Sequence, residues 1–346
     1  MSQPLAAVSW APLIEQLLAG QPMAPHQSRE LMQAWLGGKV DPVQTGALLT
    51  ALRAKGTTGA ELAAMATVLQ EATTRPEGLP PHLLDTCGTG GDGADTFNIS
   101  TAVAFTAAAC GARVAKHGNR SASGKVGSAD VLEALGLNLG AEPRRCVQAL
   151  HEVGICFLFA PGWHPGLVGM APLRRSLGIR TVFNLLGPLV NPMGPAAQVL
   201  GVAQVSLLRP MAEALAVMGM ARAIVVHGSE GLDEAGLGGE AALIHVEAGA
   251  VRPERLDPAA VGVTPAPLSA LAGGDMKTNA EILRAVLQGR GTTAQTDAVA
   301  LNTALALLAA GRVANVADGV SQARDALLCG KPWARLESLV TIVAGG

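Results

Sequence analysis

Apolar residues recur at helical spacing through the first 75 residues of the chain. Four stretches carry this pattern, and they begin at residues 10, 29, 43 and 60: WAPLIEQLLAG, RELMQAWLGG, VQTGALLTALRAKG and AELAAMATVLQEA. Because side chains three and four positions apart share one face of a helix, each stretch predicts an amphipathic helix. The residues at the predicted ends are typical helix caps: Asp41-Pro42, Thr58 with Glu61, Gly20, Gly37 and Gly56.

Proline and glycine interrupt the helical pattern in RPEGLPPH, residues 75–82. Beyond this segment, short apolar runs typical of buried strands alternate with helical patterns. The strand-like runs are HLLDTC, ARVAKH, ICFLFA, AQVLGVA and ARAIVVHG, and the C-terminal third returns to helical patterns such as TDAVALNTALALLAAG. This alternation predicts an α/β fold with a mainly parallel sheet. We therefore expect a helical domain at residues 1–75 and an α/β domain at residues 82–346.

The composition narrows the range of partners. The 346 residues carry a formal net charge of −2, and aromatic residues make up 3% of the sequence. Nucleic-acid-binding proteins usually have a basic excess and aromatic residues on which bases stack, so we expect no nucleic-acid partner. The most apolar helical stretch, residues 298–311, is too short to span a bilayer, so we expect no membrane association.

The five cysteines are odd in number, widely spaced and without a CxxC pair. This pattern is typical of reduced thiols rather than of a disulfide framework or a zinc site. The N-terminal MSQPLAAVSWAPL lacks the basic segment of a secretory signal. We therefore expect a cytoplasmic location.

A glycine-rich loop, DTCGTGGDGADTFNIST at residues 85–101, contains the spacing G-x-G-x-x-G of a dinucleotide-binding turn. That turn needs an acidic residue about 20 positions further on, and residues 96–129 contain no Asp or Glu. The sequence therefore disfavours NAD. Glycine amides followed by a helix start at Asn98 still favour a phosphate group, and Lys116 adds a positive charge.

The next loop, KHGNRSASGKVGSAD at residues 116–130, combines small residues with cations. It fits a flexible segment that closes over a polyanion, with Asn119 offering a donor and an acceptor to a second substrate. A solvated surface loop remains the alternative. His117 taken alone is more often a packed residue at a strand end than a catalyst.

Two further stretches carry charges at positions suited to ligands. In HGSEGLDE, residues 227–234, adjacent Asp233 and Glu234 follow a predicted strand and suit Mg²⁺, although a solvated acidic turn has the same pattern. In APLRRSLGIRTVFNLLGPLVNP, residues 171–192, three arginines suit a carboxylate, although a solvated helix face would also carry them. Because no nucleophilic constellation emerges, we expect a site that works by positioning and electrostatics.

Six motifs occur in one order along the chain: GTGGDG, FNIST, KHGNR, GSADVLEALG, GIRTVFNLLGPLVNP and HGSEGLDE. Together they resemble the anthranilate phosphoribosyltransferase family. The resemblance implies a small helical N-terminal domain, which also takes in about residues 175–190, and a larger α/β domain of the nucleoside phosphorylase/phosphoribosyltransferase class. It also implies a homodimer. The implied reaction converts anthranilate and phosphoribosyl pyrophosphate into N-(5-phosphoribosyl)anthranilate and pyrophosphate, in tryptophan biosynthesis.

The same resemblance implies roles for individual residues. The phosphoribosyl donor would contact Gly88, Gly91, Asp92 and Thr96. Its phosphates would be bound by Asn98, Ile99, Ser100 and Thr101. A closing loop over the donor is formed by Lys116, His117, Gly118, Asn119, Arg120, Ser121, Ala122, Ser123 and Gly124, with Ser128. Anthranilate would contact Gly88, Asn119 and Arg174. Two Mg²⁺ ions would be bound by Ser100, Asp233 and Glu234. Lys116 and Arg174 are the implied catalytic residues.

Two departures from the family pattern affect the substrate ends of the site. Val126 stands where the family often has Ser, and HPGLVGM at residues 164–170 replaces a stretch that commonly contains a Met-Lys pair. Two alternative functions remain, a pyrimidine nucleoside phosphorylase and a non-catalytic relative that binds nucleic acid. Arg174 and the FNLLGPL segment speak against the first, and the net charge and the two adjacent acids against the second. Asp95 is expected to be a solvated turn residue.

Overall fold

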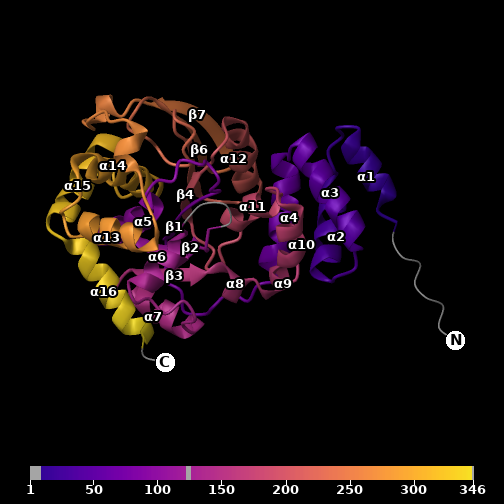
Figure 1. Ribbon diagram of the computed structural model, residues 1–346, viewed down its shortest axis with the longest axis horizontal. Helices are drawn as coiled ribbons and strands as arrows, with labels where there is room; N and C mark the ends of the chain where they lie inside the picture. The colour runs from indigo at the N-terminus through magenta and orange to yellow at the C-terminus, as the bar shows by residue number, and fades with distance from the viewer. Residues whose placement is uncertain (1–8, 122–125, 345–346) are drawn as a thin grey trace.

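The computed structural model describes residues 9–121 and 126–344 of the chain (Figure 1). Its N-terminal end is a group of helices: α1 (Ala11–Leu18), α2 (Pro25–Leu36), α3 (Pro42–Lys55) and α4 (Gly59–Glu71). The four predicted helices are confirmed, and so are two of their caps. The Asp41 carboxylate accepts a hydrogen bond from the Val43 amide over 2.8 Å, and Thr58 forms a capping box with Glu61.

One seven-stranded sheet forms the centre of the larger part of the molecule, in the order β3-β2-β1-β4-β5-β6-β7. The strands are β1 (Leu83–Gly88), β2 (Arg113–Gly118), β3 (Ile155–Phe159), β4 (Ala197–Gly201), β5 (Arg222–His227), β6 (Ala241–Glu247) and β7 (Ala250–Leu256). The first five are mutually parallel, which confirms the expected α/β fold with a mainly parallel sheet.

The antiparallel hairpin of β6 and β7 was not expected from the sequence. Its two central turn residues, Ala248 and Gly249, both have positive φ angles, 48° and 81°. Such turns match the twist of a hairpin, but they usually carry Asn or Asp before the glycine. Because Ala248 lacks that signal, the turn gives no local sequence sign of a hairpin at residues 241–256.

Helices cover both faces of the sheet (Figure 1). Beyond the N-terminal group, the helices of the described residues are α5 (Ile99–Ala109), α6 (Ser128–Ala134), α7 (Pro143–Glu152), α8 (Ala160–Trp163), α9 (Pro165–Val168), α10 (Ala171–Leu177), α11 (Phe183–Leu186), α12 (Leu208–Val217), α13 (Met276–Leu287), α14 (Thr293–Ala309), α15 (Val316–Leu328) and α16 (Lys331–Ala344). None of the described helices is long and apolar enough to cross a membrane.

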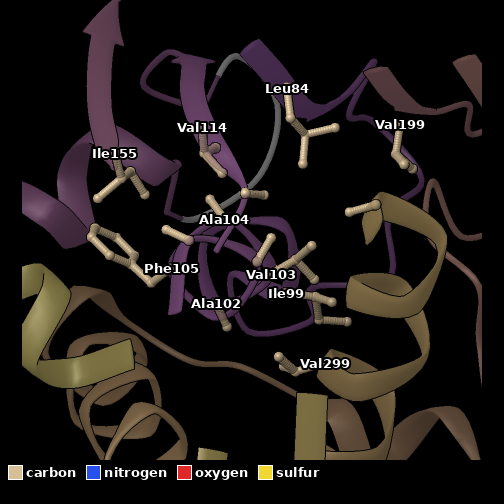
Figure 2. Close-up of a cluster of buried hydrophobic side chains, with 14 of the residues drawn as sticks. Leu84, Ile99, Ala102, Val103, Ala104, Phe105, Val114, Ile155, Val199 and Val299 are labelled. Carbon is tan, nitrogen blue, oxygen red and sulfur yellow. The ribbon is translucent and has the colours of Figure 1, made fainter. Parts of the chain in front are cut away.

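Two hydrophobic cores lie on opposite faces of the sheet, and strand β5 contributes to both. Ile224 and Val226 belong to the core that includes α5 and α14, whereas Ala223 and Val225 belong to the core shared with α12 and the N-terminal helices. This period of two follows from the pleat of a strand. Figure 2 shows the first core, in which α5 packs between the strands and α14: Leu84, Ile99, Val103, Phe105, Val114, Ile155, Val199 and Val299.

The order of strands places a topological switch point between β1 and β4. From β1 the chain continues to β2 and β3 on one side, and it later returns to β4 and β5 on the other. The loops that leave the carboxyl ends of β1 and β4 therefore diverge and leave a crevice between them. Ligands of open α/β sheets bind in this position.

The segment from α10 to α11 packs on the N-terminal helices, although it lies more than 100 residues away in sequence. Helix α10 contacts α3, and α11 contacts α4. Val182, Phe183 and Leu186 join the same hydrophobic core as α2 to α4. This packing is compatible with a helical domain that takes in about residues 175–190; the division at residues 75–82 stays a prediction.

Replacing Glu61 with Gln is expected to lower the free energy of unfolding by about 3–5 kcal/mol, because it leaves a buried charge unpaired. The Glu61 side chain is fully buried and lies 2.9 Å from the Lys55 ammonium, which is 5% exposed. It also accepts hydrogen bonds from the amides of Met23 and Thr58, both at 2.8 Å. Denaturant unfolding measures the loss.

The exposed ion pair between Arg29 and Glu71 provides the matched control for this prediction. Its side chains are 37% and 54% exposed, so Glu71→Gln is expected to cost less than about 1 kcal/mol. Equal losses in the two variants would contradict the importance of burial at Glu61.

Candidate active site

A cavity of about 670 Å³ opens at the carboxyl ends of the parallel strands. Its walls include loops that follow β1, β2, β3 and β5 and the segment from α9 to α11. Most of the residues implied by the resemblance line it: Gly88, Gly91, Asp92, Thr96, Asn98, Ile99, Ser100, Lys116, His117, Gly118, Asn119, Arg120, Ser121, Ser128, Arg174, Asp233 and Glu234. Segments far apart in the sequence thus meet in one cavity.

Thr101 does not line this cavity. Its side chain is fully buried in α5, and its hydroxyl has no hydrogen-bond partner in the part of the chain that the structure describes. Three other residues expected in the closing loop, Ala122, Ser123 and Gly124, lie outside the described residues. Sequence reasoning gave no role to four further lining residues: His164, Phe183, Asn184 and Asn279. Arg180, one of the three arginines suited to a carboxylate, also lines the cavity.

Glycines bring the loop after β1 against the turn after β5. A Cβ atom on Gly88 would overlap the Asp233 carboxylate, and one on Gly201, at the end of β4, would overlap the Asp233 backbone carbonyl. The Asp233 carboxylate accepts a hydrogen bond from the Gly90 amide over 2.7 Å. The missing side chains therefore allow an acid to lie directly on the glycine loop.

Three acids gather at this contact. Asp92, Asp233 and Glu234 each offer a carboxylate oxygen, and these oxygens lie within 4.8 Å of one another. Burial, followed by the charge of Asp233, raises the pKa of Glu234 well above its usual range, and the same two causes raise the pKa of Asp92. One oxygen of Glu234 is buried without a hydrogen-bond partner among the described residues. A divalent cation with oxygen preference fits this arrangement.

Lys116 lies at the bottom of the cavity and is only 2% exposed. Its ammonium donates hydrogen bonds to the Thr86 carbonyl oxygen over 2.6 Å and to the Ser100 hydroxyl over 3.3 Å. Burial lowers the pKa of Lys116, while the charge of buried Asp85 raises it. The positive charge thus orients Ser100 at the first turn of α5.

The helix start expected near Asn98 is confirmed, with Asn98 at the N-cap and Ile99 as the first residue of α5. The Asn98 side chain makes no capping hydrogen bond; its amide donates instead to the Val126 carbonyl oxygen over 3.2 Å. With Val instead of Ser at position 126, the chain lacks a side-chain hydroxyl there. The backbone of Val126 still links the loop after β2 to the start of α5. The helix end faces the cavity and favours an anion there.

His117 is a packed histidine, as the pattern at the strand end suggested. Burial lowers its pKa to about 3, and the nearby His164 adds to this effect. The two rings are 5.2 Å apart, and the His164 ring nitrogen Nδ1 lies 3.1 Å from the Thr73 hydroxyl. Both histidines are neutral at physiological pH, so they contribute polar atoms and shape to the cavity rather than charge.

Arginines differ in how far their charges are already paired. Arg120 forms ion pairs with Asp130 and Glu133 on α6, at 2.5 and 2.8 Å. Arg174 stacks its guanidinium 5.3 Å from the centre of the Phe183 ring and has no ion pair with any described residue. Burial lowers the pKa of Arg174, and the neighbouring charge of Arg180 lowers it further. An unpaired, half-buried guanidinium on a cavity wall suits a carboxylate ligand.

Two family descriptions match successive parts of the chain. Residues 11–73 match the helical bundle domain of a glycosyl transferase family, and residues 80–332 match the a/b domain of such a family. The fold and the cavity between its loops therefore define a glycosyl transferase that combines these two domains.

Individual relatives narrow this class. The chain is 63% identical over 335 residues to anthranilate phosphoribosyltransferase of Prochlorococcus marinus (strain MIT 9313), covering 96% of this chain and 95% of the relative. The crystal structure of the Thermus thermophilus enzyme is 44% identical, with a TM-score of 0.89 over 96% of this chain and 99% of that chain. The Saccharomyces cerevisiae enzyme is 28% identical, with a TM-score of 0.88 over 98% and 99%. The chain belongs to the anthranilate phosphoribosyltransferase family.

Proposed function

We propose that this chain transfers the phosphoribosyl group of phosphoribosyl pyrophosphate to the amine of anthranilate, in tryptophan biosynthesis. Structures of the related S. cerevisiae enzyme contain phosphoribosyl pyrophosphate (PRPP) and Mg in one case and 4-fluoroanthranilate in another. The observation that carries the proposal is the arrangement of one cavity: an acid cluster and a helix start lie in the same space as the unpaired guanidinium of Arg174. A metal-bound polyphosphate and an aromatic carboxylate would fit these features.

The donor end consists of the glycine loop, the start of α5 and the loop after β2. Asp233 and Glu234, with Asp92 beside them and the Ser100 hydroxyl, would hold two Mg²⁺ ions. When bound, magnesium neutralises the charge of the pyrophosphate and of the acids around it. The glycine amides and the first turn of α5 would bind the phosphate oxygens, and Lys116 would add a fixed positive charge below them.

The acceptor end consists of Arg174, Asn119 and the backbone at Gly88. In the reaction a C–N bond forms between the anthranilate amine and the anomeric carbon of the ribose. The C–O bond to pyrophosphate breaks, its electron pair leaves with the pyrophosphate, and the amine gives up one proton to solvent. Arg174 would hold the carboxylate so that the amine lies in line with the breaking bond, and such orientation can supply about 7–11 kcal/mol of a barrier.

Replacing Arg174 with Gln is expected to raise the KM for anthranilate by about 10- to 100-fold, because the anthranilate carboxylate loses a charge-assisted hydrogen-bond partner. The KM for phosphoribosyl pyrophosphate is expected to change little. Steady-state kinetics with each substrate varied in turn measure the two constants. A variant in which only the donor KM moves would assign Arg174 to the other end of the cavity.

Other features of the proposal rest on the resemblance. We propose two domains, residues 1–75 joined by about 175–190 and residues 82–346, together with a homodimer. The cysteine pattern, rather than the resemblance, supports a cytoplasmic location. A pyrimidine nucleoside phosphorylase is the alternative of the same fold, and cleavage of a pyrimidine nucleoside by phosphate would favour it.

A further inference from the structure

Arg180 reaches from the segment between α10 and α11 onto the glycine loop. Its Nη2 atom donates a hydrogen bond to the Thr89 carbonyl oxygen over 2.6 Å. A Cβ atom on Gly91 would overlap the same guanidinium, so the loop passes directly against it. Nothing in the motif resemblance gives this arginine a role.

Within the glycine loop, the Thr89–Gly91 turn has few other hydrogen bonds to the described chain. A second cavity, of about 450 Å³, lies on its far side, and four residues line both cavities: Thr89, Gly91, Arg180 and Asn184. The loop is therefore a thin wall between two open spaces. Apart from Arg180, the turn is held at Thr89 and Gly90 by hydrogen bonds to Gly201, Ala203 and Asp233. The far end of the loop is held separately, at Asp95 and Phe97, by backbone hydrogen bonds to Gly273 and Leu271.

Arg180 lies close to charged groups of both signs. Burial lowers its pKa, and the charge of Arg53 lowers it too, but Asp233 and Asp92 both raise it. The guanidinium thus lies within the field of the acid cluster while its hydrogen bond goes to the loop backbone. A planar guanidinium can pack one nitrogen against Gly91 and donate from another to Thr89, which an ammonium group cannot do as well.

We propose that Arg180 is a positioning residue that fixes the Thr89–Gly91 turn in the shape that binds the phosphoribosyl donor. Because Arg180 belongs to the segment packed on α3 and α4, it links the donor loop to the N-terminal helices. This inference rests on the proposed function for the identity of the donor.

Replacing Arg180 with Gln is expected to raise the KM for phosphoribosyl pyrophosphate by about 10- to 100-fold, the range of a lost charge-assisted hydrogen bond. The KM for anthranilate is expected to stay near the wild-type value, which separates Arg180 from Arg174. The matched control is Arg175→Gln, since Arg175 is exposed on the same segment and lies outside both cavities. A rise in the anthranilate KM alone would overturn the proposal.

A second pair of variants tests the contact from the loop side. Gly90 and Gly91 both have positive φ angles, 62° and 78°, so Ala strains the backbone at either position. A Cβ on Gly90 meets no atom within 4 Å, whereas one on Gly91 meets Arg180. We expect Gly91→Ala to weaken donor binding more than Gly90→Ala does. That excess should disappear in the Arg180→Gln background, because the two changes act on one contact. If the effects of Gly91→Ala and Arg180→Gln on donor binding simply added in the double variant, the proposal would be overturned.

Calorimetry of phosphoribosyl pyrophosphate binding in the presence of Mg²⁺, without anthranilate, separates this proposal from the proposed function. Weaker binding by Arg180→Gln, in a variant whose melting temperature matches that of Arg175→Gln, supports the role of Arg180 even if anthranilate is not the acceptor. Unchanged donor affinity in Arg180→Gln overturns it, whatever the acceptor.

Discussion

Replacing Asp233 with Asn and Glu234 with Gln together is expected to lower kcat/KM by about 1000-fold or more, the range seen when charge-stabilising groups are removed from an active site. The two acids meet Asp92 within 4.8 Å, and burial together with mutual repulsion raises the pKa of Glu234. Such a cluster is unfavourable unless a cation or protons neutralise it. The amides keep the shape of the turn but lose the charge that would bind Mg²⁺.

A magnesium titration of activity measures this effect directly. The double variant is expected to need far more Mg²⁺ for half-maximal rate, or to show no rate at all. Asp95→Asn is the control, because Asp95 is an exposed acid that lines the same cavity outside the three-acid cluster. An unchanged magnesium titration in the double variant would remove Asp233 and Glu234 from the metal site.

Replacing Lys116 with Gln is expected to lower kcat by about 100-fold, because a fixed positive charge below the donor phosphates is lost. Lys116 is almost fully buried and orients the Ser100 hydroxyl. Its removal also leaves Asp85, which is fully buried, without the cation that lowers the pKa of its carboxyl. We therefore expect a loss of stability as well, of a few kcal/mol.

Two measurements keep these effects apart for Lys116. Rates are compared only under conditions where the far-ultraviolet circular dichroism of the variant matches that of the wild type. The exposed Lys331, which does not line the cavity, provides a control in the form of Lys331→Gln. A folded Lys116→Gln variant with a wild-type kcat would show that this charge plays no part in catalysis.

The sequence predicted those parts of the fold that depend on neighbouring residues. The helix ends at Asp41 and Thr58 follow from local hydrogen bonds. The hairpin of β6 and β7 was missed because Ala248 adopts a positive φ without being Gly or Asn. Its conformation is set by strand pairing rather than by its own preference.

In the candidate site, too, the sequence indicated what depends on neighbouring residues but not the contacts between distant segments. Asp233 and Glu234 were found because they follow a strand, and Arg174 because it lies in a cluster of arginines. Asp92 was assigned to the donor, but its place beside these two acids depends on how β1 and β5 are brought together by β4. Arg180 was noted in the sequence, yet its contact with Thr89 spans 91 residues and cannot be read from spacing.

Asp95, expected to be a solvated turn residue, is exposed and has a φ of 50°, a conformation that Asp tolerates better than most residues. Its backbone carbonyl accepts a hydrogen bond from the Gly273 amide over 2.8 Å. The residue therefore shapes the glycine loop through its backbone, which the sequence pattern did not indicate.

The central claim is tested most directly by mixing the protein with phosphoribosyl pyrophosphate, Mg²⁺ and anthranilate and following the fluorescence of anthranilate. The account predicts that fluorescence falls only when all four components are present, with one pyrophosphate released for each anthranilate consumed. A folded protein that leaves the fluorescence unchanged in the complete mixture would contradict it.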